Sequence, residues 1–135
     1  MSNTLGFTTK QLLDEGQFFT LDFLNTASTL EIGEIAKSLG VRKNLPIAVE
    51  VRIGDWIIFH ASLPGSKVEN QGWIDRKARV VMLKEHSTLF ERVSAHELGV
   101  DWFVENYLTE STHAIHWGGL PLITQGDGFV GGVID

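Results

Sequence analysis

Three residues near the middle of the chain have the types and spacing to bind a small anionic molecule. Trp73, Arg76 and Lys77 are three and four positions apart, which places them on one surface if the segment is helical. Arginine offers a forked donor that suits carboxylates, and the face of an indole can hold a flat ligand. The alternative is an ion pair with Glu50, Asp75 or a neighbouring subunit, with Trp73 in the core. The residues alone favour this structural alternative.

Two histidines, His113 and His116, have the i, i+3 spacing that places two imidazoles on one metal ion if the segment is helical. No acidic third ligand stands at a diagnostic distance, and His96–Glu97 lacks the second histidine of a zincin motif. We therefore predict no metal site. His113 is expected at the surface, and His116 is expected to be a hydrogen-bonding group near Gly118–Gly119.

The common nucleophile and nucleotide motifs are missing from the sequence. The absence of cysteine excludes a thiol nucleophile, a disulfide scaffold and cysteine-ligated metal centres. No G-x-S-x-G elbow occurs, and Ser87 is merely adjacent to His86 in the sequence. The glycines of QGDGFVGG lead into a predicted strand rather than a helix, so they do not form a dinucleotide fingerprint. Gly131 and Gly132 are predicted to mark a bulge or a close backbone approach.

Length and composition predict one globular domain. The chain has 135 residues, of which 43% are hydrophobic and 21% charged, and this balance is typical of a folded domain. Its net charge of −6 argues against nucleic acid as a partner. The polar N-terminus lacks the order of a signal peptide, and no apolar run approaches the ~20 residues that cross a bilayer. We expect a cytoplasmic protein without a membrane partner.

Hydrophobic periodicity and turn residues predict helices and strands in a mixed order. Ile47, Val49, Val51 and Ile53 alternate with less apolar residues, which indicates a half-buried strand. Gly54–Asp55 predicts a hairpin turn. The predicted elements are a short helix before Gly16, a strand or arm over 18–24, a helix ending at Gly40, strands over 47–53 and 56–63, a helix from Asn70 or Gly72 to Lys84, helical turns to Leu98, a short helix after Asp101, and strands over 120–124 and 129–134. This order implies an α+β domain with helices on the faces of an antiparallel sheet.

Several of these residues, taken together, resemble a known family. The resemblance runs from about Leu21 to the end of the chain and rests on Leu63–Pro64–Gly65, Asn70, Trp73–Ile74–Asp75–Arg76–Lys77, His86–Ser87, and His116 with Gly118–Gly119 and Pro121. Proteins with these motifs form the haem-degrading-domain family, the GlcG- and HbpS-like proteins, and in particular an uncharacterised cytoplasmic branch of it.

The resemblance implies a profilin-like fold, with a five-stranded antiparallel sheet between helical layers in a three-layer α/β/α arrangement. Members are typically homo-oligomers built from dimers, and some bind haem or are credited with degrading it. The ligand-binding residues that the resemblance implies are Trp73, Arg76, Lys77, His86, His116, Gly118 and Gly119. Among them, Arg76 and Lys77 suit the propionates of haem, and His86 and His116 are the candidates to ligate its iron.

Two departures from the family pattern bear on the site. Trp117 stands where the family has a small residue, so an indole is expected to fill or reshape the neighbouring cleft. The sequence ends at Gly132–Val133–Ile134–Asp135, where family members continue through Val-Ser-Gly into a terminal helix. We therefore expect a single domain over 1–135 that lacks this helix.

Three functions are consistent with the sequence. The first is a small-ligand binder for haem or another anionic molecule. The second is a protein-interaction scaffold, and the third is an enzyme on a small anionic metabolite with His116 as acid or base. No catalytic set is identifiable, which favours binding over catalysis. The sequence predicts self-association into a homo-oligomer. The reasons are the apolar pairs Phe18–Phe19 and Trp102–Phe103 and the open edges of the predicted sheet, which one small monomer does not usually cover.

Overall fold

The computed structural model describes residues 6–16 and 20–135, and the helices and strands in these residues follow the predicted order, apart from the strand or arm predicted over 18–24. The elements are α1 (Thr9–Gly16), α2 (Thr26–Arg42), β1 (Ala48–Ile53), β2 (Trp56–Ser62), α3 (Glu69–Lys84), α4 (Thr88–Leu98), α5 (Trp102–Asn106), β3 (Gly119–Thr124) and β4 (Gly128–Ile134). The predicted turn at Gly54 is confirmed, since Gly54 adopts a φ angle of 58°. Gly128, where β4 begins, adopts a φ of 69°, and glycine accepts both angles readily.

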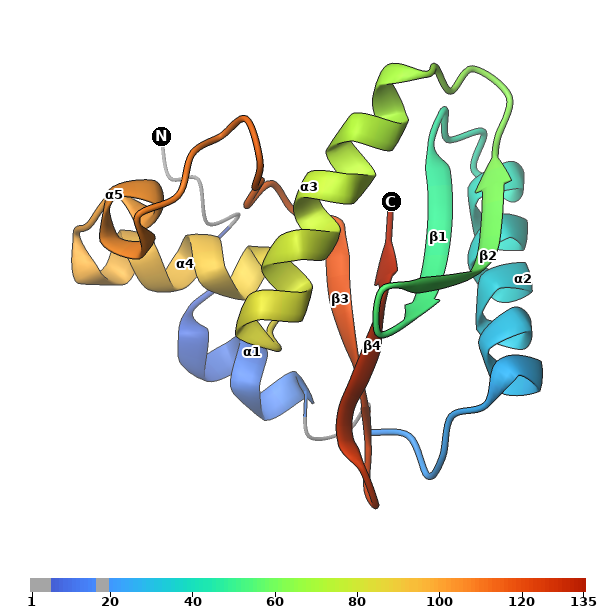
Figure 1. Ribbon diagram of the computed structural model, residues 1–135, viewed down its shortest axis with the longest axis horizontal. Coiled ribbons are helices and arrows are strands. Elements are labelled where there is room, and N and C mark those ends of the chain that lie inside the picture. Colours follow the sequence, from blue (N-terminus) through green and yellow to red (C-terminus); the bar gives the residue numbers. More distant parts are fainter. Residues whose placement is uncertain (1–5, 17–19) are drawn as a thin grey trace.

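The strands form one antiparallel sheet in the order β2-β1-β4-β3, so the last strand of the chain lies between β1 and β3 (Figure 1). In this register Glu50 of β1 faces His60 of β2 on one side and Ile134 of β4 on the other. The hairpin between β1 and β2 carries an irregularity between Val51 and Arg52. The two edges of the sheet are β2 and β3.

The expectation of five strands is wrong for the described residues, which contribute four. Leu21, in the segment predicted as a strand or arm, makes a single parallel bridge to Thr124 beside β3. Its N–H donates to Ile123 over 2.8 Å, and its carbonyl accepts from Gln125 over 2.9 Å. No ladder follows, because the chain turns at Asn25 to begin α2. Phe18 and Phe19 lie outside the described residues.

The start of α2 explains that turn. The Asn25 side chain accepts from the Ser28 N–H over 2.8 Å, and the Ser28 hydroxyl accepts from the Asn25 N–H over 2.9 Å. This reciprocal capping box satisfies two backbone donors that a helix start otherwise leaves unpaired. The capping geometry therefore ends the extended segment and directs the chain along α2.

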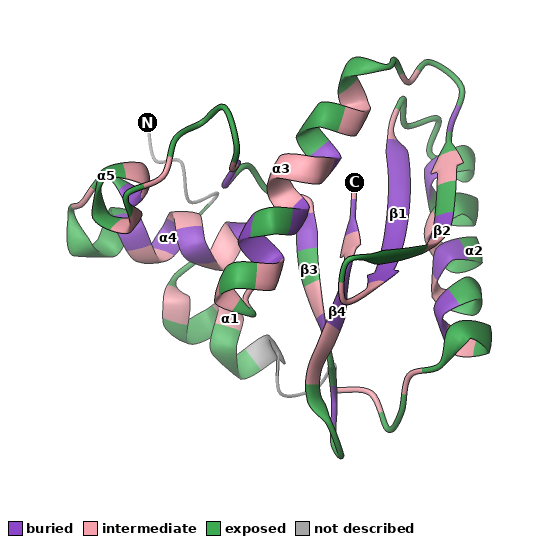
Figure 2. Ribbon diagram, in the orientation of Figure 1, coloured by how far each residue is buried: buried purple, intermediate pink, exposed green. Residues whose placement is uncertain are grey.

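Helices α2 and α3 cover opposite faces of the sheet, and the most buried residues follow β1 between them (Figure 2). On the α2 face, Val51, Phe59 and Leu122 form a cluster against which Ile32 packs. On the α3 face the core consists of Ala48, Ile74, Ala78 and Ile134. Successive side chains of a strand point to opposite faces, so β1 supplies both cores.

Strand β1 is buried on both faces, and the prediction of a half-buried strand is wrong. Glu50 is 1% exposed and Arg52 is 9% exposed, although their alternation with valines indicated a solvated face. The physical reason is that α3 packs across this face of the sheet. Charged side chains seldom lie this deep unless they are paired, and here they are paired with one another.

Helices α4 and α5 lie beyond β3, on the opposite side of the molecule from α2 (Figure 1). Trp102, one of the residues expected to be available for self-association, is 5% exposed and belongs to a core cluster with Val80, Ala95 and Ile115. Its indole N–H donates to Glu91 over 3.1 Å. Within residues 6–16 and 20–135, no helix has the length and apolar character needed to span a membrane.

Candidate functional site

An aromatic–cation cluster of Trp73, Arg76 and His116 forms where α3 meets the segment before β3. The rings of Trp73 and His116 meet edge to face, with centroids 4.8 Å apart and an interplanar angle of 74°. The Arg76 guanidinium carbon lies 4.1 Å from the centre of the Trp73 ring, within the range of a cation–π contact. Trp73 is 37% exposed. It is therefore a partly exposed side chain and not a core residue.

Backbone oxygens hold Arg76 in this position. Its Nη1 donates to the carbonyl of Glu110 over 3.0 Å, and its Nε donates to the carbonyl of Gly72 over 3.1 Å. The acidic partners considered from the sequence, Glu50 and Asp75, bind Arg52 instead. The guanidinium thus keeps its positive charge beside the indole while two carbonyls fix its orientation.

Lys77 lies next to this cluster but is directed at the end of β4. Its ammonium donates to the Asp135 carbonyl over 2.8 Å and lies 3.9 Å from Asp135 Oδ1. Burial lowers the pKa of Lys77, the Asp135 carboxylate opposes this, and Arg76 adds to it. Gly118 adopts a φ of 126°, and a β-carbon there would overlap Asp135 Oδ1 and lie 3.0 Å from Lys77 Nζ. A side chain at this turn would therefore displace the Lys77–Asp135 pair.

His116 stands in a positive environment. Burial lowers the pKa of its imidazole, and Arg92, Lys77 and Arg76 lower it further, while Glu110 opposes the change. A histidine with a lowered pKa is neutral at pH 7, and a neutral imidazole carries the lone pair that ligates metals or accepts a proton. The cluster therefore combines a neutral nitrogen donor with nearby cations.

The remaining predicted residues lie elsewhere. His86 follows α3, where its Nδ1 is 3.4 Å from Glu91 and its ring centroid is 4.1 Å from that of Phe90. Both of these contacts are with residues that lie outside the aromatic–cation cluster. Gly119 has a structural contact, because its N–H donates to the Thr88 hydroxyl over 3.1 Å.

His113 and His116 are not helical, so the i, i+3 geometry that would bring both imidazoles to one metal does not arise. His113 instead lies beside Trp102, with ring centroids 6.3 Å apart, and its Nδ1 is 2.8 Å from the Thr112 hydroxyl. Across the part of the chain that the structure describes, no group of three or more histidine or acidic side chains is arranged to hold a metal ion.

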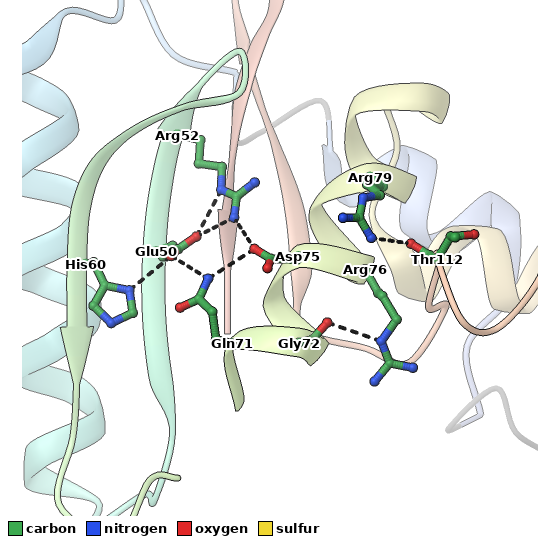
Figure 3. A network of polar contacts seen from close by, with 9 residues as sticks. All are labelled: Glu50, Arg52, His60, Gln71, Gly72, Asp75, Arg76, Arg79 and Thr112. Atoms are coloured by element: carbon green, nitrogen blue, oxygen red, sulfur yellow. Dashed lines mark hydrogen bonds and ion pairs between the residues drawn. The ribbon is translucent and has the colours of Figure 1, made fainter. Parts of the chain in front are cut away.

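A second group of polar residues, not predicted from the sequence, lies between β1, β2 and α3 (Figure 3). Its centre is the Glu50 carboxylate. Oε2 accepts from Arg52 Nε over 2.9 Å and from Nη2 over 2.6 Å. Oε1 lies 3.0 Å from His60 Nδ1 and accepts from Gln71 over 2.9 Å. Asp75 completes the network, because it accepts from both Arg52 and Gln71.

The signal for this network in the sequence was incomplete. Glu50 and Arg52 at i, i+2 within an apolar strand share one face, and Gln71 and Asp75 at i, i+4 share one face of a helix. Their meeting with His60 depends on the hairpin register and on the position of α3. Neither can be read from local spacing, since both are set by packing across the sheet.

Two open grooves flank the network. The larger, of about 550 Å³, has Arg52, Asp75, Arg79 and His113 among its lining residues. The smaller, of about 380 Å³, is lined by Ala48, Ser62, Ser66, Lys67, Val68 and Gln71. Both volumes lie in the range of small-molecule sites. The buried network is therefore in contact with two surfaces that solvent reaches.

Comparison with known proteins adds relatives in sequence and in fold. A "UPF0303 protein" of Streptomyces avermitilis is 35% identical over 102 residues, which are 76% of this chain and 63% of that protein. The Ybr137w protein matches the structure with a TM-score of 0.83 at 17% identity, over 95% of this chain and 76% of its own. A PduOC:heme complex matches with a TM-score of 0.62 at 15% identity, over 85% and 81% of the two chains.

At these identities the two structural matches establish the fold alone. The chain spans less than two thirds of the length of the Streptomyces protein. A family model described as "Haem degrading protein HbpS-like" matches residues 24–134. The resemblance inferred from the motifs is thereby confirmed, and the chain belongs to the HbpS-like family.

Proposed function

We propose that this chain is a ligand-binding domain whose aromatic–cation cluster takes up a planar anionic molecule, with haem as the candidate ligand. The observation that carries the proposal is the position of His116, a neutral imidazole beside the Trp73 ring and within the field of Arg76, Lys77 and Arg92. An imidazole nitrogen is one of the protein groups that hold haem iron, and cations pair with its propionates. The residues present fit both roles.

Each member of the cluster has a distinct part in this proposal. His116 is the candidate iron donor, Arg76 pairs with a carboxylate, and the Trp73 ring offers a flat face to a conjugated ligand. Trp117 follows His116 and is 60% exposed, so in this proposal its indole is accessible to a ligand. The description of the family and the heme complex of PduOC support haem as the ligand to test. The ammonium of Lys77 is engaged by Asp135 and therefore contributes mainly through its charge.

Titration of the purified protein with haem tests the proposal by visible absorption. We expect a sharp Soret shift with the wild-type chain and its loss in His116→Ala. An Arg76→Gln variant should weaken haem binding about tenfold, because one charge-assisted hydrogen bond is lost. The matched control is His86→Ala, which removes another partly exposed imidazole of the family motifs but one that lies beside Glu91. A shift that survives in His116→Ala, or the absence of any wild-type shift, would contradict the proposal.

We also propose that the domain works as a homo-oligomer. Trp56 and Ile57, at the start of edge strand β2, are 61% and 46% exposed, and Leu120 on edge strand β3 is 57% exposed. Exposed apolar side chains on the edge strands of a sheet favour association in a symmetric assembly.

Sedimentation at micromolar concentration tests the assembly. The wild-type chain should sediment as a multiple of its 15.0 kDa mass, and Trp56→Glu should dissociate it, because a charge at an apolar contact must be desolvated. Val104→Glu, a change at an exposed position of α5, should leave the assembly intact. A single 15.0 kDa species for the wild type would rule out the oligomer.

A further inference from the structure

We propose that Ser62 is a nucleophile for acyl transfer, activated by His60 and positioned by Glu50, and that the smaller groove accepts short acyl esters. This activity is independent of the proposed haem site, since none of the three residues belongs to the aromatic–cation cluster. The proposal rests on a chain of two contacts, Ser62 to His60 and His60 to Glu50, which the fold of the β1–β2 hairpin creates.

The hairpin register aligns the three side chains. Glu50 and His60 are directly opposite one another in the β1–β2 pairing, and Ser62 follows His60 by two residues, on the same face of β2. His60 Nδ1 lies 3.0 Å from Glu50 Oε1, and His60 Nε2 lies 3.0 Å from Ser62 Oγ. The imidazole therefore bridges a buried carboxylate and an exposed hydroxyl.

The carboxylate determines which way the protons point. An ionised carboxylate only accepts hydrogen bonds, so in the proposed relay the His60 ring, in its neutral form, carries its proton on Nδ1 and hydrogen-bonds through it to Glu50. Nε2 is then an acceptor, and the Ser62 hydroxyl must donate to it. A serine that donates its hydroxyl proton to an imidazole oriented by a carboxylate is the arrangement that activates serine nucleophiles in unrelated folds.

Burial keeps Glu50 in the required orientation. Arg52 binds Oε2 through two donors, and Gln71 donates to Oε1 over 2.9 Å. With these partners the Glu50 carboxylate is fixed at 1% exposure, while the reacting end of the relay faces solvent. General-base catalysis requires a base that is held within hydrogen-bond reach of the proton it removes. In this proposal the fixed Glu50 carboxylate holds the His60 base beside the Ser62 hydroxyl.

The groove supplies space and charge for a substrate. Ser62 lines the groove of about 380 Å³ together with Lys67 and Val68, at the start of α3. Lys67 is the basic residue among those that line this groove, and its ammonium is the group that we assign to stabilise an oxyanion. Ser66 lines the same groove, but its hydroxyl donates to the Leu63 carbonyl over 2.6 Å. Of the two serines, only Ser62 contacts a base.

The proposed reaction balances without any cofactor. Ser62 Oγ attacks the carbonyl carbon of the ester, and its proton passes to His60 Nε2. The tetrahedral adduct collapses, the bond to the leaving alcohol breaks, and His60 returns the proton to the departing oxygen. Water then attacks the acyl-serine as His60 accepts its proton. The second adduct collapses, the bond to Ser62 Oγ breaks, and His60 returns the proton to that oxygen. The products are an acid and an alcohol, and the serine is restored.

Acylation by p-nitrophenyl acetate, followed by intact-mass and peptide mass spectrometry, tests the proposal. We expect one acetyl group on the peptide that carries Ser62, with p-nitrophenol released in a burst. Ser62→Ala should abolish the label, and His60→Gln should slow it about 100-fold, the usual contribution of a general base. His60 lies on an edge strand with a partly exposed ring, so this variant should retain the fold.

Matched controls separate the relay from simple surface reactivity. Ser66→Ala removes a neighbouring serine, whose hydroxyl is bonded to the Leu63 carbonyl, and should leave the labelling rate unchanged. Labelling at Ser66 rather than Ser62, an equal rate in His60→Gln, or no label on the wild-type chain would overturn the proposal. The outcome does not depend on whether the chain binds haem.

Nitrogen-15 chemical shifts of the His60 ring test the positioning role of Glu50. The wild-type ring should be protonated at Nδ1, and Glu50→Gln should remove that preference, because the amide can donate to Nδ1 as well as accept from it. A neutral wild-type ring protonated at Nε2 would overturn the relay, since the Ser62 hydroxyl would then have no acceptor on His60.

Discussion

Replacing Glu50 by alanine is expected to lower the free energy of unfolding by about 3–5 kcal/mol. The change removes the acceptor of two Arg52 hydrogen bonds. Arg52 is 9% exposed, and its guanidinium would keep the ion pair with Asp75 but lose the one with Glu50. Breaking a buried ion pair from one side is costly because the remaining charge stays desolvated. Urea denaturation followed by tryptophan fluorescence measures the effect.

The control for this change is an exposed ion pair. On α2, Lys37 Nζ lies 4.0 Å from Glu34 Oε2, and both side chains are exposed. Glu34→Ala should therefore change the free energy of unfolding by less than about 0.5 kcal/mol. The double variant Glu50→Leu with Arg52→Met should recover much of the loss, because a buried ion pair can be replaced by apolar side chains of similar size. Equal effects of Glu50→Ala and Glu34→Ala would show that the network does not stabilise the fold.

Replacing Gly131 by alanine is expected to destabilise the fold by about 3 kcal/mol or more, at the upper end of the cost of overpacking. A β-carbon at this position of β4 would overlap the backbone carbonyl of Arg52 in β1. Backbone atoms of a paired strand cannot move aside as a flexible side chain can. Thermal unfolding should show the loss, and amide exchange should show that β1 and β4 separate first.

Gly126 provides the matched control for Gly131. It lies in the turn between β3 and β4, and a β-carbon there meets no atom within 4 Å. Gly126→Ala should therefore leave the melting temperature nearly unchanged. If Gly131→Ala behaved in the same way, the close approach of β1 and β4 would not constrain residue 131.

Local signals in the sequence were sufficient to place most elements. Asn25 begins α2 with its capping box, Gly99 ends α4 with a φ of 69°, and Gly54 forms the hairpin turn. These features depend on neighbours within four residues. The predicted close backbone approach at Gly131 is likewise confirmed, because a glycine in the interior of a strand is most simply explained by a neighbour that leaves no room for a side chain.

What the sequence did not predict depends on contacts between distant segments. The burial of Glu50 arises from α3, and the burial of Trp102 arises from packing against Val80 and Ile115. Local periodicity does not contain this information. The same distinction applies to the aromatic–cation cluster. The contact of Trp73 with Arg76 follows from helical spacing, but the position of His116 beside Trp73 does not. The His60–Ser62 contact was not predicted, because a histidine and a serine in one strand suggest a relay only when a carboxylate lies opposite them. Here that carboxylate is Glu50 on β1.

The central position of β4 has a consequence for the order of events during synthesis. Strand β1 pairs with β4 from Glu50 opposite Ile134 to Ile53 opposite Gly131, so the sheet is joined only after residue 134 has left the ribosome. Until then the β1–β2 hairpin and β3 are separate pieces with unpaired edges. A nascent chain that stalls before Gly128 would present both edges to other copies, and it would do so with Glu50 and Arg52 not yet enclosed. Emergence of β4 is therefore the step that turns two association-prone fragments into one folded domain.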